Sequence, residues 1–373
     1  MFQTCPPDEA CEYCRGLRAT PKVADIVDAV YCISIQEQPE RFAAVQALFH
    51  AEGLCQDVVF YRPKRGRSPN PAIWSSHRAV AREALRRGQR RILVLEDDIR
   101  LVGSWTRAVA AARRAIAKLP PDWRALYLGH WPIAAYFAGR GVLRTMSGAT
   151  HAYIANLPLL RWLDETEPMD PYAPKRPRSI GGGIDSAFSG LPLMFAVFPM
   201  RIVQRRMKEV RDPTRRPGLF ERERYRLFVI VHGMRLAEWT AALLSPLHWL
   251  LMRRKAPAAG LSAQAQAEVR RQFDADYYLE RYPDVAAAGY PALAHFVEHG
   301  AREGRAPNRW FDTAWYASRY PDARGKDLNP FEHYISSGKS LGYFPNADAA
   351  AGARAEALGA GQEAALGAAV AAR

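Results

Sequence analysis

Residues 91–98 read RILVLEDD, a short apolar run that leads directly into three consecutive acidic residues. An apolar run of this length with polar residues at its ends is typical of a strand buried in a sheet. In open α/β sheets, ligands bind beyond the carboxyl ends of the strands. The segment therefore predicts an α/β fold that places Glu96, Asp97 and Asp98 at the ligand-binding edge of a sheet.

Strand-like and helix-like segments alternate along the first half of the chain. Apolar, β-branched segments predict strands over 23–36, 57–62, 91–95, 125–130, 150–156 and 197–204. Apolar residues at helical spacing predict helices over 41–53, 73–87 and 104–119. Such alternation is typical of a mostly parallel α/β sheet.

The chain carries a formal net charge of +14 and has a sequence pI of about 9.7. An excess of this size favours anionic partners, which include nucleic acids, anionic membrane surfaces and phosphorylated substrates. No nucleic-acid-binding motif accompanies the basic stretch from Arg205 to Arg226. We therefore expect no nucleic-acid partner, and we expect phosphorylated substrates and an anionic membrane surface instead.

All five cysteines lie within the first 55 residues, and their odd number does not indicate a disulfide framework. Cys11 and Cys14 are spaced like metal ligands, and Cys5 lies close to them, but no fourth cysteine or histidine lies near them in the sequence. The favoured interpretation is a set of reduced thiols in a leader. No secretory signal pattern is visible at the start, so a cytoplasmic location is expected.

The expected organisation is one large domain followed by a small repeat module. In chain order we expect a leader (1–22), a GT-A-like domain (23–226), an apolar and basic segment (227–256), a linker (257–271), two repeats (272–346) and an Ala/Gly-rich tail (347–373). Charged residues interrupt the apolar part of the third segment, so a membrane span is not expected. A helix in a membrane interface and a helix packed on the core both remain open for it.

A repeat with a constant offset of 38 residues occupies the C-terminal part of the chain. The matching positions include Phe273 with Phe311, Tyr278 with Tyr316, His295 with His333, Gly300 with Gly338, and Pro307 with Pro345. A fixed period without insertions predicts two copies of one small helical unit. The aromatic residues could stack on sugars, but a shared core is the favoured interpretation.

The acids at 96–98 are the main candidates for chemistry. In extended backbone, Glu96 and Asp98 would point to one side and Asp97 to the other. Two carboxylates on one side suit a hard divalent cation such as Mn²⁺ or Mg²⁺, and such a cation would let the acids bind a diphosphate.

Several motifs, in order, resemble glycosyltransferase family 25, which includes bacterial lipopolysaccharide and collagen galactosyltransferases. The matching blocks are Val30–Ile35 with Pro39-Glu40-Arg41, Ser76-His77, Leu95–Asp98, Thr150–Ile154, Asp185 and Gln204. The resemblance covers roughly residues 28–210. It implies a GT-A-like fold, a divalent metal, a UDP-sugar donor (galactose most often) and inversion at the anomeric carbon. The implied acceptor is a lipopolysaccharide or another surface glycan, reached from the inner face of the membrane.

The resemblance also implies roles for individual residues. Asp185 is the candidate base that takes the acceptor proton, and Asp170 is the alternative for this downstream acid. Asp97 is a second catalytic candidate. The candidate metal ligands are Asp98 and Glu96, and the candidate donor-binding residues are Arg41, Ser76, His77, Glu96, His151 and Gln204.

Two stretches depart from the family pattern, namely 34–38 and 169–183. A decayed site would produce such departures, so the alternative is a non-catalytic glycan-binding or scaffold protein that acts through its repeats. A metal-dependent phosphohydrolase is a weaker possibility, because no further His/Asp cluster supplies a second metal site.

Overall fold

The structure is a computed structural model that describes residues 1–19, 23–130, 132–172, 183–204, 261–324 and 328–353. The chain divides into two compact units. The first comprises Met1–Met169 and Ala173–Lys255, and the second comprises Asp170–Tyr172 and Ala256–Arg373. Most of the expected α/β domain (23–226) belongs to the first unit, and the two sequence repeats (272–346) belong to the second.

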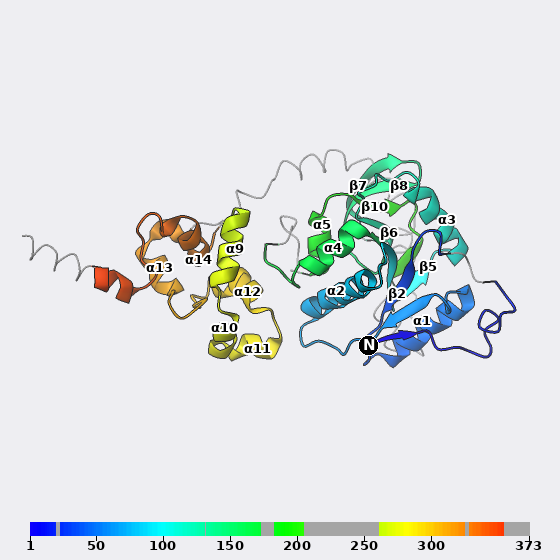
Figure 1. The fold of residues 1–373 in the computed structure, drawn as a ribbon, viewed down its shortest axis with the longest axis horizontal. Helices are drawn as coiled ribbons and strands as arrows, with labels where there is room; N and C mark the ends of the chain where they lie inside the picture. Colours follow the sequence, from blue (N-terminus) through cyan, green and yellow to red (C-terminus); the bar gives the residue numbers. More distant parts are fainter. Residues whose placement is uncertain (20–22, 131, 173–182, 205–260, 325–327, 354–373) are drawn as a thin grey trace, which may run out of the picture. The chain divides into compact units, whose positions relative to one another are not determined.

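A nine-stranded sheet forms the centre of the first unit, with the strand order β1-β3-β2-β4-β9-β6-β10-β8-β7 (Figure 1). Its strands are β1 (Phe2–Thr4), β2 (Ala29–Ile33), β3 (Val58–Tyr61), β4 (Arg91–Glu96), β6 (Ala125–Gly129), β7 (Pro132–Gly139), β8 (Val142–Ser147), β9 (Ala152–Asn156) and β10 (Met194–Val197). A separate two-stranded sheet pairs β5 (Ile99–Leu101) with β11 (Ile202–Gln204).

The strands of the large sheet run mainly in one direction. β1, β8 and β9 run against the other six strands. Because these three are interspersed, only three of the eight neighbouring pairs are parallel, namely β2–β3, β2–β4 and β6–β10. The sheet agrees with the expected α/β class, and most of its strands share one direction. Most of its neighbouring strand pairs are nevertheless antiparallel.

Helices cover both faces of the sheet. They are α1 (Pro39–Glu52), α2 (Pro69–Arg86), α3 (Trp105–Ile116), α4 (Leu157–Glu165) and α5 (Ile184–Gly190). α1 and α3 share one hydrophobic core with alternate strand residues such as Leu93 and Leu95. α2, α4 and α5 pack on one another at the opposite face, where Trp74, Trp162 and Phe188 are in ring contact.

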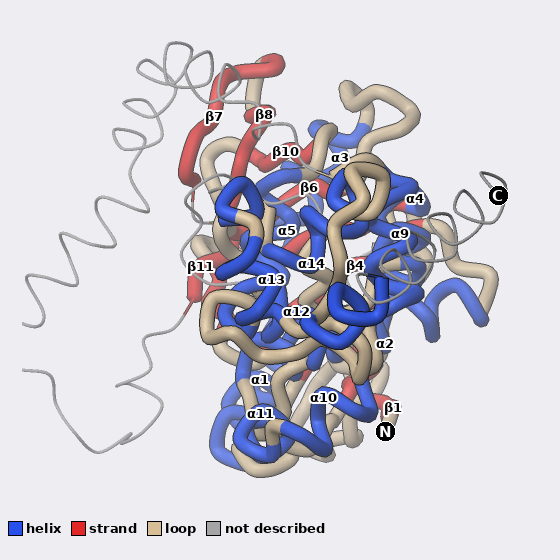
Figure 2. Tube along the Cα trace, turned by 90° about the vertical axis from the view of Figure 1, so that its left-hand side faces the viewer, coloured by secondary structure: helices blue, strands red, loops and turns tan. Residues whose placement is uncertain are grey.

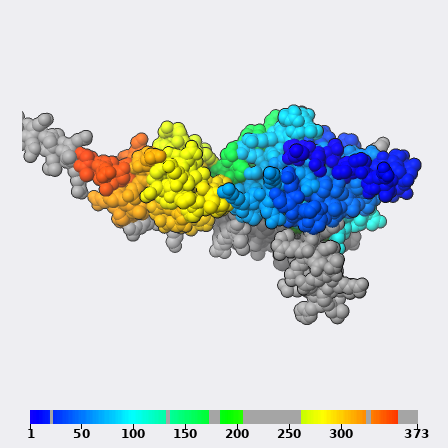
Figure 3. Space-filling view, turned by 90° about the horizontal axis from the view of Figure 1, so that it is seen from below, coloured from blue at the N-terminus to red at the C-terminus, as the bar shows by residue number. Residues whose placement is uncertain are grey.

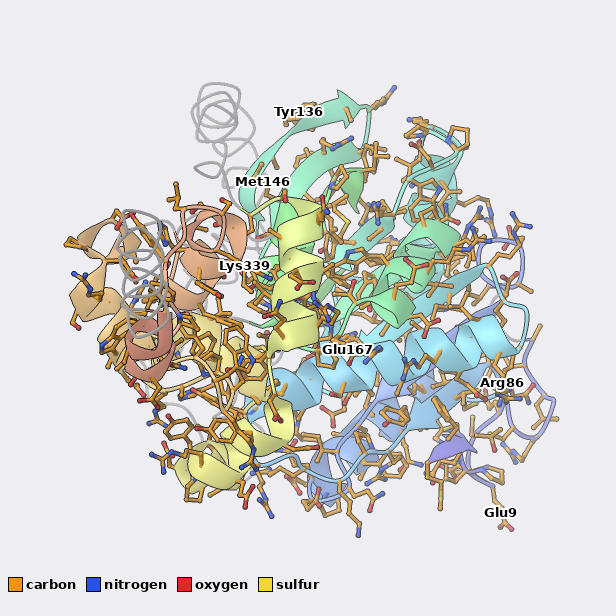
Figure 4. The ribbon with its side chains drawn as sticks, turned by 60° about the vertical axis from the view of Figure 1, so that its left-hand side comes forward. Glu9, Arg86, Tyr136, Met146, Glu167 and Lys339 are labelled. Atoms are coloured by element: carbon orange, nitrogen blue, oxygen red, sulfur yellow. The ribbon has the colours of Figure 1, made fainter. Side chains whose placement is uncertain are left out.

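The helix ends follow local sequence signals. α1 ends before Gly53, which has a φ of +75° and so suits the left-handed turn that stops a helix. α2 begins at Pro69, four residues before the expected start. Proline is well tolerated there, because the N–H groups of the first turn have no partner within a helix and the missing N–H costs nothing. It ends at Arg86, which Figure 4 labels.

Several expected segments differ from the structure. The strand expected over 23–36 is limited to β2, and the one expected over 197–204 is divided between β10 and β11. The hairpin of β7 and β8 was not expected, and Figure 2 shows it beyond β10 at the end of the sheet. The described residues of the predicted leader belong to the first unit, because β1 pairs with β3 and Cys5 and Cys11 are buried.

The second unit is helical over its described residues. Its elements are α9 (Ala263–Gln272), α10 (Ala275–Arg281), α11 (Pro283–Ala288), α12 (Ala292–His295), η1 (Phe296–Gly300), α13 (Thr313–Arg319), η2 (Pro321–Arg324), α14 (Pro330–His333) and η3 (Tyr334–Gly338). Asp274 caps α10 and Asp312 caps α13, each accepting a backbone hydrogen bond three residues ahead. Tyr278 is hydrogen bonded to His295 at 3.0 Å, and Tyr316 to His333 at the same distance.

The aromatic residues of this unit form its core. Tyr278, Tyr316 and Phe331 are fully buried, whereas Trp310 is 37% exposed. Residues 347–353 of the expected tail are helical, and the rest of the tail lies outside the described residues. The basic stretch 205–226, the segment 227–256 and the first residues of the linker also lie outside them. In the described part of the chain, every helix is too short or too polar to span a membrane.

We expect Gly300→Ala to destabilise the second unit. A Cβ atom at Gly300 would overlap the hydroxyl of Tyr278, which is hydrogen bonded to His295. Overpacking of a closed core costs about 1–3 kcal/mol. Gly352→Ala is the matched control, because nothing lies near its added methyl group. Thermal unfolding of the full chain should show a lower transition for Gly300→Ala only, and equal transitions for both variants would contradict this packing.

Candidate functional site

Arg41 holds two of the three acids at the end of β4. Its Nη2 atom lies 2.7 Å from Asp97 Oδ1 and 2.7 Å from Asp98 Oδ2, and its Nη1 donates to Gln38 at 3.0 Å. Arg41 lies in the first turn of α1, which begins at Pro39. Both aspartates are only 5% exposed, so the guanidinium balances charge that water does not reach.

The acids do not alternate as an extended strand would require. β4 ends at Glu96, and Asp97 and Asp98 form the turn that leads into β5. Both aspartates therefore contact Arg41, whereas Glu96 lies against His77 and Thr150. The alternation expected for an extended strand therefore does not apply to Asp97 and Asp98, because the strand geometry stops at Glu96.

Gln204 reaches Asp98 through the small sheet. β5 follows the acids directly, and its pairing with β11 places Gln204 opposite Ile99. The Gln204 Nε2 atom donates to Asp98 Oδ2 at 2.9 Å. A residue more than a hundred positions away in sequence thus contacts the acidic turn, and its predicted contact with a donor stays a prediction.

Glu96 is held by side chains from two other elements. Thr150 donates to Glu96 Oε1 at 3.1 Å, and His77 Nε2 lies 3.6 Å from the same oxygen. The other ring nitrogen of His77 is hydrogen bonded to the hydroxyl of Tyr153 at 2.8 Å. Burial alone would raise the pKa of Glu96, but the hydrogen bond and charge of His77 outweigh it and lower that pKa.

Asp98 and Asp185 each have one carboxylate oxygen that accepts no hydrogen bond from the described residues. Asp98 Oδ1 and Asp185 Oδ1 are buried and have no hydrogen-bond partner among the described residues. Burial and the charge of Glu96 raise the pKa of Asp98 to about 7, although Arg41 opposes this shift. A buried carboxylate oxygen without a partner favours uptake of a proton or binding of a cation.

Asp185 is the downstream acid that shares the surroundings of Glu96. It lies in the first turn of α5, and burial, followed by the charge of Glu96, raises its pKa to about 7. The alternative acid, Asp170, belongs to the second unit, where it is paired with Arg270 at 2.8 Å. Asp185 is thus the acid whose pKa is shifted by Glu96, and its role as a base stays a prediction.

Ser76 and His151 support the site in other ways. The hydroxyl of Ser76 donates to the carbonyl of Ala72 within α2, so its bond is internal to the helix. The backbone carbonyl of His151 accepts from the amide of Glu96 at 2.9 Å. Burial lowers the pKa of the His151 ring. Both residues thus help to fix the local backbone, and their predicted contact with a donor stays a prediction.

Sequence reasoning gave no role to Thr150, Tyr153 or Gly129. Thr150 and Tyr153 lie in or beside β9, and both contact residues of the acidic site. Both residues belong to the sequence block Thr150–Ile154 around His151, and this block could have indicated them as site residues. A Cβ atom at Gly129 would overlap the backbone carbonyl of Ile202 and lie 2.5 Å from His151 Nε2, so this glycine permits the approach of β11.

Two cavities lie elsewhere on the first unit. One of about 420 Å³ lies beside the first residues of β2 and β4, and Asp28, Arg91 and Asn156 are among its lining residues. The other, of about 290 Å³, has a basic lining: Arg114, Lys118, Arg140 and Arg201. Neither is lined by the acids at 96–98, of which Asp97 and Asp98 lie in the buried cluster around Arg41.

Comparison with models of known protein families finds no match, and comparison with curated proteins finds none. Among solved structures, the chain is distantly similar to a glycosyltransferase involved in glycosylation of the major capsid of PBCV-1 (12% identity, TM-score 0.25, 39% of this chain and 68% of that one). It is also similar to A197 from STIV (10%, 0.26, 51% and 97%) and to a mannose-1-phosphate geranyltransferase from Thermus thermophilus (12%, 0.25, 48% and 74%). Likenesses this distant carry no conclusion about function.

We expect Arg41→Met to destabilise the first unit strongly. The substitution leaves Asp97 and Asp98 buried without their shared cation, and breaking a buried pair costs about 3–5 kcal/mol. Arg82→Met is the matched control, because its pair with Asp164 is about half exposed and is worth less than about 1 kcal/mol. Denaturant titration of metal-free protein measures both losses. Similar small losses in the two variants would show that Arg41 does not hold the acids.

Proposed function

We propose that the chain is an inverting glycosyltransferase that moves a sugar, galactose in the simplest case, from a UDP-sugar to a glycan or glycolipid acceptor. The observation that carries the proposal is the meeting of separate sequence blocks at one place. Arg41, His77 and Gln204 come from three different elements, and each contacts an acid of the 96–98 run. These are the positions at which the sequence resembles glycosyltransferase family 25.

The donor set around Asp98 fits a divalent cation. The buried Oδ1 atom of Asp98 has no hydrogen-bond partner among the described residues, and carboxylate oxygens are preferred ligands of Mn²⁺ and Mg²⁺. Asp98 would be the first ligand, and Glu96 and Asp97 are the further candidates beside it. A bound cation would offset the charge of the acids and stabilise the departing diphosphate. We thus propose Asp98 Oδ1 as the first ligand of the Mn²⁺ or Mg²⁺ ion expected from the sequence.

The protein side chains divide the remaining work. Arg41 supplies positive charge at the acidic turn and holds Asp97 and Asp98 in fixed positions. Asp97, whose Oδ1 atom is paired with Arg41, would then order the site rather than take a proton. Ser76, His77, His151 and Gln204 are the remaining candidates for contact with the donor.

Asp185 is the proposed base. In an inverting transfer, a carboxylate takes the proton of the acceptor hydroxyl while that oxygen attacks the sugar opposite the departing UDP. A general base is most effective when its pKa lies near the working pH. Burial and the charge of Glu96 raise the pKa of Asp185 to about 7, which meets this requirement.

The acceptor and location are proposed on more general grounds. The net charge of +14 would attract the protein to an anionic membrane surface, where lipid-linked surface glycans are assembled. We therefore propose a lipopolysaccharide or similar acceptor, reached from the cytoplasmic side. The scaffold alternative receives less support, because Tyr278, Tyr316 and Phe331 fill the core of the second unit and are unavailable for sugar stacking.

We expect Asp98→Asn to remove metal-dependent nucleotide binding. Calorimetry should show that the wild-type chain binds UDP at least tenfold more tightly with Mn²⁺ than without it, because the cation offsets the charge of the acids. Asp98→Asn should lose this gain, and Asp164→Asn, a surface control, should retain it. An Asp98→Asn variant that binds UDP and Mn²⁺ as tightly as the wild type would refute the metal role. Glycan binding without any affinity for UDP would favour the scaffold alternative.

We expect Asp185→Asn to lower the turnover of UDP-sugars about 10²–10⁴-fold, the usual contribution of general base catalysis. Wild-type kcat/KM should decline as the pH falls below about 7, because protonated Asp185 cannot accept a proton. Asp170→Asn is the matched control, since Asp170 is paired with Arg270 in the second unit. UDP release from a panel of UDP-sugars measures both variants. Equal losses, or a loss only in Asp170→Asn, would contradict the assignment of the base.

A further inference from the structure

Four potential metal ligands from separate parts of the sequence meet in the N-terminal part of the first unit. They are Cys11, Cys14, His50 and Cys55, and their ligand atoms all lie within 4.8 Å of one another. The first two come from the turns after β1, His50 comes from the last turn of α1, and Cys55 follows the end of that helix. Cys11 and Cys14 have no further cysteine or histidine ligand among their neighbours in the sequence apart from Cys5. The fold supplies His50 and Cys55 instead.

We propose that this cluster is a structural Zn²⁺ site with three thiolates and one imidazole. Three of the six distances between ligand atoms are close to those of a tetrahedral zinc site: 3.8 Å for Cys11 Sγ to Cys55 Sγ, 3.5 Å for Cys14 Sγ to Cys55 Sγ, and 3.5 Å for Cys14 Sγ to His50 Nδ1. All six lie within 4.8 Å. Zinc bonds of about 2.3 Å to sulfur and about 2.0–2.1 Å to nitrogen predict separations of about 3.8 Å between two sulfurs and about 3.5 Å between sulfur and nitrogen.

The donor chemistry selects the metal. Thiolate and imidazole ligands in a tetrahedral arrangement favour zinc, whereas Mn²⁺ and Mg²⁺ prefer carboxylate and water oxygens. Binding releases one proton from each of the three thiols to solvent, and the resulting site carries one net negative charge. The cluster is therefore chemically distinct from the acidic site around Asp98, and the proposal does not depend on the function proposed for that site.

The surroundings of the cluster are those of a closed, structural site. Cys11 and Cys55 are buried, and Cys14 and His50 are partly buried. All three cysteines are free thiols, and their separations are far from the roughly 2.05 Å of a disulfide bond. Four protein ligands leave no open position, which is the arrangement of structural rather than catalytic zinc.

The second nitrogen of His50 also has a partner. Its Nε2 atom lies 3.9 Å from Cys5 Sγ, on the side of the ring away from the proposed metal ligand Nδ1. Histidines that bind metals usually have their other nitrogen engaged, because this fixes the orientation of the ring. Cys5 is thus a neighbour that orients His50, and it is excluded from the ligand set.

The proposed metal would fasten the start of the chain to α1. Residues between Cys5 and Leu17 form turns without a regular helix or strand, so few backbone bonds hold them in place. In Figure 3 the first residues, in dark blue, lie against the lighter blue residues that follow them. A metal that joins Cys11 and Cys14 to His50 and Cys55 would add to the contacts that Cys11 and Tyr13 make with the hydrophobic core.

The test is the metal content and ligand field of the full chain purified under reducing conditions. Elemental analysis should find one zinc per chain, and modification of the thiols should release it. After exchange of zinc for Co²⁺, the protein should show a thiolate-to-cobalt charge-transfer band and the intense visible bands of tetrahedral cobalt. These two measurements use the wild-type chain, so they do not depend on whether a variant folds.

Variants then identify the ligands. Cys55→Ser and His50→Gln should each reduce the zinc content at least tenfold, whereas Cys32→Ala should retain it, because Cys32 is neither a ligand nor a neighbour of one. Wild-type protein without bound zinc, a weak octahedral cobalt spectrum, or a Cys14–Cys55 disulfide found by mass spectrometry under reducing purification would each overturn the proposal. Retention of zinc in Cys55→Ser would overturn it as well.

Discussion

The contact of Arg41 with Asp97 and Asp98 is the interaction on which the rest of the site depends. Two adjacent carboxylates at 5% exposure would repel each other strongly without a cation between them. Arg41 supplies that cation from the first turn of α1, so the acidic turn and the helix are fixed together. The bond from Gln204 is made to the same turn that Arg41 holds.

One arginine does not balance all of the buried acid. Glu96 is stabilised by His77 and Thr150, whereas Asp98 and Asp185 keep pKa values raised to about 7 and one unpartnered oxygen each among the described residues. Such a surplus destabilises the folded protein unless a proton or a cation is bound. The same excess of negative charge would favour both the binding of a divalent cation and the acceptance of a proton from a hydroxyl group.

α1 connects the two proposed metal sites. Arg41 lies in its first turn and His50 in its last, about 13 Å apart along the axis at 1.5 Å per residue. A metal at the His50 end would fix one end of the helix, and the acidic turn fixes the other. The two sites use different donors, with sulfur and nitrogen at one end and oxygen at the other, so each selects its own cation. The N-terminal residues therefore belong to the framework of the domain.

The sequence by itself determined several of the elements and the position of the acidic run. Local patterns were sufficient for β4, for α1 with its stop at Gly53, and for the acids at the end of β4, because apolar periodicity and turn residues act over a few positions. Only the tertiary structure decided the partners: Arg41 for both aspartates, and His50 with Cys55 for the N-terminal cysteines. These pairings join residues tens of positions apart, and the sheet order and register that bring them together are long-range properties that no local pattern encodes.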